Sequence, residues 1–574
     1  MRFDGIVWLI GYLRIRFSSQ ITCKWAGCSR FTGLFKFPEE AANRSHARFN
    51  PVARPKVPWQ SDRFQRGYRE RANHPRVFAL SVRRTSLNSR LPRWAQLSTP
   101  WPNPTFCIMA FRIHSSVPYV LLALAAVFSP IKGAGAATPN LILIIADDMS
   151  PEDSESYGGK TVRTPHLARL AREGLRFERG FVTTSSCSPS RASIATGRYP
   201  HETGASELHQ PLPANQIVFP EKLREAGYWT GAAGKWHLGK PAQAKFDVVQ
   251  EGGGPSGCEN WIPMLRGRPA GQPFFLWLAA LDPHRDYQAN TIPQPHTAAD
   301  VSVPPFLPDV PEVRADFARY YDEITRLDGY VGSVLDELER QGVAENTLIL
   351  FISDNGRPFP RCKTTLYDSG IRSPWLVRWP AQVKPGMVSN RLVSTVDIAP
   401  TFLALAGAAA LPDGSGQSFL PQLHDPTAPG RDYIYGERHW HDYGDFARAV
   451  LSERWKYIRN YFPDLPNQPP ADAVRSPTFT TMRQLHAAGK LTAAQAVSFQ
   501  APRPREELYD LTADPHELRN LADDRNHQAT LGQLRTALEN FQKTTKDRVP
   551  DRVRPDEFHR VTGERLNAAR KSAK

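Results

Sequence analysis

Short apolar runs recur through the middle of the chain, separated by longer segments of mixed polarity. The first run spans 141–146, and others span 228–233, 274–281 and 347–352. Continuous apolar runs of this length are typical of strands that are buried on both faces, as in a parallel sheet. These four segments are therefore the predicted strands of one central sheet.

Two helices are predicted between these strands. Thr164-Pro165 and Gly174 bracket 166–173, which gives that segment a cap, a first-turn proline and a C-terminal glycine. Apolar residues then recur every three or four positions from Phe317 to Leu338, and Gly342 ends the pattern. Strands that alternate with helices predict an α/β layered domain, which we place at 137–430.

Beyond about Gly430 the pattern changes to short strands, at 433–435, 455–459 and 507–511. An amphipathic helix follows, with its apolar side at Leu531, Leu534, Leu538 and Phe541. We expect a smaller α+β domain with a short antiparallel sheet over 431–574. Its charged tail, from about Lys543, is expected to become ordered only by docking.

Polar residues follow each of the predicted strands directly. They are Asp147-Asp148, Lys235 with His237, Asp282 with His284, and Asp354-Asn355. In open α/β sheets, ligands bind at the carboxyl ends of the strands. One such pair on its own is more often a solvated loop, but four strand ends with matching chemistry predict an active site.

Composition adds a constraint on the partners of the protein. The chain has 574 residues, 41% of them hydrophobic, and a formal net charge of +15, so it can fill a large core and is not a low-complexity chain. Residues 1–108 hold 19 Lys and Arg against 5 Asp and Glu, so nearly all of the net charge lies there. The rest of the chain is balanced, and nucleic-acid binding is not expected.

The segment that follows predicts export. Met109 opens a short run with Arg112 and His114, followed by an apolar stretch at 117–128 and small residues at 133–137. This order is typical of a secretory signal peptide over 109–136, cleaved near Ala136. The apolar stretch is too short for a stable membrane span. We therefore expect a periplasmic, cell-surface or secreted protein, translation from Met109, and residues 1–108 as a basic extension from a misassigned start.

The most specific segment is 186–198, SCSPSRASIATGR. Pro189 suits the first turn of a helix, which places Cys187 at a helix N-terminus among free backbone N–H groups. Arg191 adds a positive charge one turn later. From the residues alone, this predicts a thiol of low pKa in an anion-binding pocket.

Cys187-x-Pro189-x-Arg191, continuing to Thr196-Gly197, resembles the signature of the type I sulfatases. The resemblance implies an alkaline-phosphatase-like fold with a large mixed sheet flanked by helices. It also implies that Cys187 is converted to formylglycine by a formylglycine-generating enzyme, and that the hydrated aldehyde is the nucleophile. A sulfated saccharide is then the expected substrate.

The strand-end residues fit the same family. Asp147, Asp148, Asp354 and Asn355 are hard oxygen ligands, which favour Ca²⁺ or Mg²⁺ over zinc. The resemblance selects calcium, with the modified Cys187 as a further ligand.

The resemblance also assigns the catalytic side chains. Lys235 and His237 match its Gly-Lys-x-His element, and His284 and Lys363 match the pair that contacts the sulfate and the leaving group. The mechanism it implies uses Arg191, Lys235 and Lys363 to stabilise negative charge. His284 protonates the leaving atom, and His237 accepts a proton when sulfate departs.

Within the family, the chain resembles the heparan N-sulfatases, or sulfamidases, which act on N-sulfoglucosamine. The matching stretches are 185–193, 208–210, 274–285, 303–309, 353–360, 476–479 and 507–510. Lys363 departs from this branch, because the animal pattern has Arg at that position. The positive charge is kept, but the planar guanidinium, which can donate two parallel hydrogen bonds, is lost. The candidate sugar contacts are His209, Glu437, Arg438, His439 and His441, although a solvated polar loop would explain those at 437–441 equally well.

Other functions remain open at this stage. The same site could serve an exported O-sulfatase that acts on another sulfated polysaccharide fragment. A phosphate or phosphonate ester hydrolase is disfavoured, because the chain shows no two-zinc ligand set. A non-catalytic protein that binds sulfated glycans would be expected to lack some of the catalytic residues, and all of the expected types are present. The sequence carries no prediction of oligomeric state.

Overall fold

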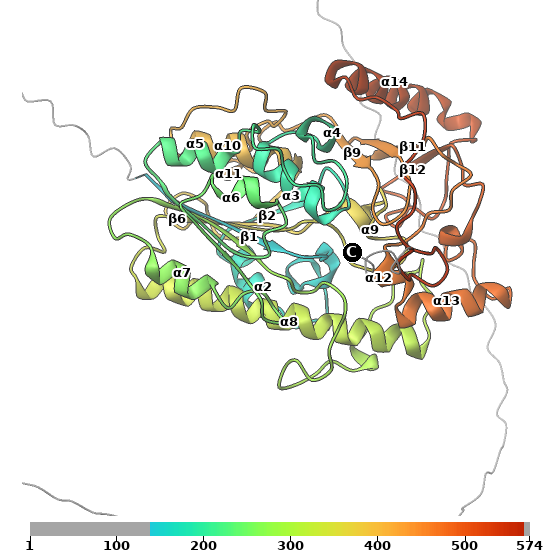
Figure 1. Cartoon of the computed structure of the whole chain (residues 1–574), viewed down its shortest axis with the longest axis horizontal. Helices are drawn as coiled ribbons and strands as arrows, with labels where there is room; N and C mark the ends of the chain where they lie inside the picture. The colour runs from blue at the N-terminus through green and yellow to red at the C-terminus, as the bar shows by residue number, and fades with distance from the viewer. Residues whose placement is uncertain (1–137, 567–574) are drawn as a thin grey trace, which may run out of the picture. The chain divides into compact units, whose positions relative to one another are not determined.

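The computed structural model describes residues 138–566. The predicted signal peptide and the basic extension at 1–108 lie outside these residues. An eight-stranded mixed sheet forms the centre of the described structure (Figure 1), in the order β4-β3-β5-β1-β6-β7-β2-β8. The strands are β1 (Asn140–Ala146), β2 (Leu175–Phe181), β3 (Trp229–Gly234), β4 (Val248–Glu251), β5 (Phe274–Ala279), β6 (Thr347–Ser353), β7 (Trp375–Arg378) and β8 (Met387–Ser394).

Every neighbouring pair in this sheet is parallel except the two pairs that β7 makes with β6 and β2. The four strands predicted from apolar runs are β1, β3, β5 and β6, and they are adjacent in the sheet. Their carboxyl ends therefore meet at one edge.

Helices cover both faces of this sheet, as the alternation of side chains along β1 requires. Leu141, Leu143 and Ile145 pack into one apolar cluster, and Ile142 and Ile144 pack into another on the opposite face. The first cluster includes side chains of α3 (Cys187–Thr196), α5 (Phe219–Glu225), α10 (Ile398–Leu405) and α11 (Leu420–His424). The second includes side chains of α2 (Pro165–Arg172), α7 (Trp261–Gly267) and α8 (Pro311–Arg340).

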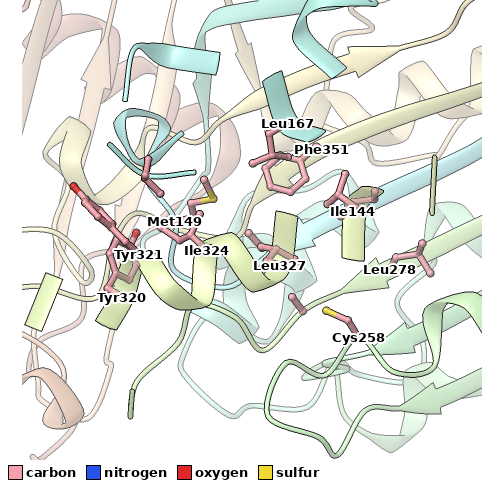
Figure 2. Close-up of a cluster of buried hydrophobic side chains, with 14 of the residues drawn as sticks. Ile144, Met149, Leu167, Cys258, Leu278, Tyr320, Tyr321, Ile324, Leu327 and Phe351 are labelled. Carbon is pink, nitrogen blue, oxygen red and sulfur yellow. The ribbon is translucent and has the colours of Figure 1, made fainter. Parts of the chain in front are cut away.

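The long helix α8 follows the predicted apolar spacing. Figure 2 shows Ile324 and Leu327 of α8 in the apolar cluster that also holds Ile144, Leu278 and Phe351 of the sheet. Each of these side chains is fully buried, which stabilises the packed state by about 1.5–3 kcal/mol per large aliphatic or aromatic side chain. Short helices complete this part: α4 (Pro200–Thr203), α6 (Lys240–Gln243) and α9 (Asp368–Ile371).

A separate four-stranded antiparallel sheet, in the order β12-β11-β10-β9, follows in the chain. Its strands are β9 (Ile434–Arg438), β10 (Ala447–Leu451), β11 (Trp455–Asn460) and β12 (Glu506–Asp510). One face packs against the end of β2 and α9, and α14 (Gln528–Thr545) covers the other with the four predicted apolar residues. The helices α12 (Ala471–Val474) and α13 (Pro477–Ala487) lie between β11 and β12 in sequence. Both predicted sheets are therefore confirmed, while the predicted domain boundary near residue 430 stays a prediction.

The charged tail after α14 docks on the loop between β9 and β10. Trp440 donates its indole N–H to the carbonyl of Pro555 at 2.9 Å, and the backbone N–H of Gly444 donates to the carboxylate of Asp556 at 2.8 Å. These two hydrogen bonds connect the tail to that loop. Among residues 138–566, we find no helix that has both the length and the apolar character needed to cross a bilayer.

Candidate active site

The polar residues that follow β1, β3, β5 and β6 gather at one edge of the sheet. Asp147 and Asp148 leave β1, and both side chains are fully buried, as are those of Asp354 and Asn355 after β6. The backbone N–H of Asp148 donates to Asp354 Oδ1 at 3.3 Å, which ties the two loops together. This edge is the centre of the candidate site.

Cys187 reaches the same point from the first residue of α3. Ser186 is the N-cap in extended conformation, and Gly197 ends the helix in the left-handed conformation at φ 62°. Cys187 Sγ lies 3.9 Å from Asp148 Oδ1. The predicted low thiol pKa is wrong: burial raises the pKa of Cys187 far above its usual value, although Lys235 and Lys363 act to lower it. An unmodified thiol here is protonated at neutral pH.

The carboxylate cluster has the composition of a divalent cation site. One ligand atom from each of Asp147, Asp148 and Cys187 lies within 4.8 Å of the others. The Oδ1 atoms of Asp147 and Asn355 are buried without a hydrogen-bond partner. Unpaired buried oxygens are costly, and bound cations satisfy such atoms. The residues present therefore fit a hard divalent ion.

Each carboxylate of the cluster also faces one basic side chain. The pairs are Asp147 with Lys235, Asp148 Oδ2 with Lys363 Nζ at 2.7 Å, and Asp354 Oδ2 with Arg191 Nε and Nη2, both at 2.8 Å. Three negative and three positive side chains sum to zero. A divalent cation together with a divalent oxyanion would leave this balance unchanged.

His237 and His209 form a pair beside Lys235. His209 Nδ1 and His237 Nε2 are 2.8 Å apart, and both residues have positive φ, at 63° and 56°. Burial and the charges of Lys235 and Arg191 hold the pKa of His237 well below its usual value, so its imidazole is neutral near pH 7. Its buried Nδ1 has no hydrogen-bond partner. A neutral imidazole with a free nitrogen can accept a proton.

An open pocket of about 430 Å³ lies next to this pair. Its lining includes His209, Lys235, His237, Lys240 and Glu251. Polar and charged side chains therefore face space large enough for a small polar ligand.

His284, in the loop after β5, lies on another side of the carboxylate cluster. Its Nδ1 contacts the backbone carbonyl of Arg285, and its Nε2 lies 3.9 Å from Asp148 Oδ2. The same Nε2 lies 3.7 Å from the carboxylate of Asp472, a residue of α12. The ring edge that carries Nε2 thus faces the site.

A buried ion pair anchors the loop that carries His284. Arg285 donates Nη1 and Nη2 to the two carboxylate oxygens of Asp316, both at 2.9 Å, and its Nε to the carbonyl of Pro358 at 2.8 Å. Thr478 donates its hydroxyl to Asp316 at 2.6 Å. Phe359 stacks on Phe317 of α8 with a centroid distance of 3.9 Å. The motifs at 358–360 and 476–479 therefore support this loop and do not themselves enter the site.

The candidates of the smaller sheet separate into two groups. His441 reaches the site, because its Nδ1 lies 2.7 Å from the hydroxyl of Ser186, next to Cys187. Glu437 and His439 do not reach it: Glu437 has no exposed surface, and its oxygens pair with His201 at 2.6 Å and with His439 at 2.8 Å. Arg438 is buried against Asn467 and Asp445.

Sequence reasoning missed two residues at or behind the site. Asp472 faces His284 from the four-residue helix α12, and Asp316 holds Arg285 from α8. An acidic residue near the start of a helix is usually explained by the helix dipole, so the local sequence gave no signal for Asp472.

Two family models match the chain. A family model described as "Sulfatase" matches residues 139–254 and 258–408. A second, described as "N-sulphoglucosamine sulphohydrolase, C-terminal", matches residues 361–467.

Two curated relatives are similar over most of the described chain. An ulvan-active sulfatase of Formosa agariphila is 33% identical, covering 70% of this chain and 74% of the relative. The human N-sulphoglucosamine sulphohydrolase is 34% identical, covering 71% of this chain and 90% of the relative.

Solved structures share the fold at lower identity. A protein in complex with its substrate D-glucosamine-2-N,6-O-disulfate aligns with a TM-score of 0.56 at 22% identity, covering 72% of this chain and 99% of that chain. A phosphonate monoester hydrolase of Agrobacterium radiobacter aligns with a TM-score of 0.55 at 19% identity, covering 71% and 96%. These likenesses show the fold alone.

Proposed function

The chain belongs to the sulfatase family, and from that premise we propose that this hydrolase of sulfated sugars removes sulfate from N-sulfoglucosamine units of heparan-type or heparin-type glycans. The observation that carries this choice is the match of residues 361–467 to the C-terminal model of N-sulphoglucosamine sulphohydrolase. This segment contributes Lys363 and His441 to the site, next to Asp148 and Ser186.

Members of this family use a divalent metal, and the ion proposed here is calcium. Asp147, Asp148, Asp354 and Asn355 would hold it, since two of their oxygens are buried without a partner. Bound there, the ion supplies Lewis-acid polarisation of a sulfate oxygen.

Family members also carry a formylglycine, and we assign it to Cys187. Its hydrate would supply a nucleophilic hydroxyl group, whereas burial keeps the thiol of an unmodified cysteine protonated and therefore weakly nucleophilic. A formylglycine-generating enzyme is the partner that this assignment requires.

The basic side chains of this chain bind and polarise the sulfate. Lys235, Lys363 and Arg191 surround residue 187 and present fixed positive charge where negative charge grows on the sulfate oxygens. They are held in place by carboxylates before substrate arrives, so little reorganisation is needed during the reaction.

Two histidines move protons at opposite sides of the site. His284 Nε2 faces the site and is the proposed donor to the leaving nitrogen, with Nδ1 held at the carbonyl of Arg285. His237, neutral because of burial and Lys235, is the proposed acceptor of the proton released when sulfate departs. His209 holds His237 Nε2 and lines the adjacent pocket, where a neighbouring sugar would fit.

Export is part of the same proposal. The predicted signal peptide at 109–136 would direct the protein to the periplasm, the cell surface or the medium. Its cleavage near Ala136 would leave a mature chain that starts just before β1.

One experiment tests the nucleophile and export together. Peptide mass spectrometry of protein from its native host is expected to find formylglycine at position 187 and a mature N-terminus near Ala137. Unmodified cysteine at 187 in that protein would contradict the mechanism.

A substrate panel tests the specificity. N-sulfoglucosamine is expected to have a higher kcat/KM than 6-O-sulfated glucosamine or an ulvan oligosaccharide, with Cys187→Ala as the inactive control. The second candidate is an O-sulfatase on another polysaccharide, favoured by the 33% identity to an ulvan-active sulfatase. Turnover of ulvan fragments without turnover of N-sulfoglucosamine would select it.

A further inference from the structure

Asp472 brings a negative charge into a site whose substrate is an anion. It is the second residue of α12, from the part of the chain that follows β11. The backbone N–H of Ala473 donates to Asp472 Oδ1 at 2.6 Å, which fixes one carboxylate oxygen. The other oxygen, Oδ2, points to His284 Nε2 at 3.7 Å. The side chain is 15% exposed, so this oxygen retains access to the space in front of His284.

The charged neighbours of Asp472 show which part of the substrate it would meet. Lys363 and Arg285 are the cations whose charges act on it, the imidazole of His284 lies beside them, and Lys363 also pairs with Asp148. His441 and Asp442 are the other titratable groups nearby. Asp472 therefore lies beyond the sulfate-binding cations, on the side where His284 meets the leaving group.

A carboxylate at this place cannot bind sulfate, because like charges repel. It favours a hydrogen-bond donor or a positive charge on the leaving group. Hydrolysis of a sulfamate breaks the S–N bond, the nitrogen keeps the electron pair, and RNH–SO₃⁻ with H₂O becomes RNH₃⁺ and SO₄²⁻. A sulfate ester, RO–SO₃⁻ with H₂O, instead gives ROH, SO₄²⁻ and H⁺. Only the nitrogen leaving group becomes positively charged.

We propose that Asp472 is a specificity-determining residue that favours amine over alcohol leaving groups. Its free oxygen accepts a hydrogen bond from the sulfamate N–H and then stabilises the ammonium group of the product. This inference rests on the proposed function, since it explains how the site would prefer N-sulfated sugars.

The test compares two substrates in Asp472→Asn, which removes the charge and keeps the shape. We expect kcat/KM for N-sulfoglucosamine to fall about 10- to 100-fold, as when one hydrogen bond to a charged group is lost. The kcat/KM for 4-methylumbelliferyl sulfate, whose leaving group never becomes positive, is expected to stay within about twofold. Equal losses on both substrates, or no loss on the sulfamate, would overturn the inference.

A second measurement reads binding without the sulfamate reaction. Glucosamine, as its ammonium form, is expected to inhibit hydrolysis of 4-methylumbelliferyl sulfate competitively, with an inhibition constant about 10-fold higher in Asp472→Asn than in the unchanged protein. An unchanged inhibition constant would contradict the role of Asp472.

Asp442→Asn is the matched control. Asp442 accepts a hydrogen bond from the backbone N–H of Ala471, at the start of the same helix, at 2.9 Å. This variant is expected to leave the ratio of the two kcat/KM values unchanged. Failure of the proposed function has a different signature, because the unchanged protein would then hydrolyse O-sulfated substrates and not N-sulfoglucosamine.

Discussion

Replacing Asp316 with alanine removes both carboxylate acceptors of the buried Arg285 guanidinium. Each side chain of this pair is 3% exposed, and the two N–H···O distances are 2.9 Å. At an effective dielectric constant of about 20, one such pair of charges attracts by about 6 kcal/mol. The variant no longer has to desolvate the carboxylate, and this gain offsets part of the lost attraction. We therefore expect the free energy of unfolding to fall by about 3–5 kcal/mol.

Equilibrium urea unfolding followed by tryptophan fluorescence measures this cost. Because Arg285 follows His284 directly, we also expect kcat/KM for the sulfated substrate to fall in Asp316→Ala. The double variant Arg285→Met, Asp316→Leu leaves no unpaired buried charge and is expected to recover at least half of the lost stability. A cost below about 1 kcal/mol for Asp316→Ala, or a double variant as unstable as the single one, would refute the electrostatic reasoning.

Three further predictions concern the metal, the sulfate cations and the smaller sheet. Chelation is expected to abolish activity, and Ca²⁺ to restore it better than Mg²⁺ in an activity titration, since Ca²⁺ accepts many protein oxygen ligands whereas Mg²⁺ usually keeps several waters and binds one or two carboxylates. Lys363→Ala is expected to lower kcat about 10²- to 10³-fold, and Lys363→Arg to lower it less, by steady-state kinetics. Burial raises the pKa of Glu437, but Arg448 and the bonds from His201 and His439 together hold it well below its ordinary value of 4.5. The stability that this carboxylate contributes is therefore present above pH 4.5 and is lost as the pH falls below that value. Glu437→Gln is expected to be less stable than the unchanged protein at pH 7, and the difference in stability is expected to shrink below pH 4.5. The KM of the variant is expected to be unchanged.

The central strands could be predicted because their sequences carry no competing pattern. β1, β3, β5 and β6 are buried along nearly their whole length and contain mostly apolar residues and no charged ones. β2, LRFERGF, was missed because charged residues alternate with its buried ones, and β4 was missed because it is a four-residue strand at the edge of the sheet. Partly exposed strands give a weaker signal than buried ones.

Some residues of the site could be predicted from the sequence and others could not. Residues at strand ends, such as Asp148 and His237, could be placed from sequence because parallel strands bring their ends together. Glu437 could not, since its place depends on the register of β9, which pairs it with Arg448 of β10. Asp472 and Asp316 reach the site or its supporting loop only through packing between segments far apart in the chain.

The burial of Cys187 has a consequence for the time at which this residue is accessible during synthesis. Cys187 is only 2% exposed in the folded protein, and the loop that brings His441 to Ser186 beside it is made after residue 430. The nascent chain therefore presents the segment around Cys187 as open polypeptide long before the smaller sheet exists. An enzyme that modifies this cysteine must act within that interval. If Cys187 is modified as proposed, the fraction of active molecules depends on the relative rates of modification and folding, and refolding an unmodified chain would not change it.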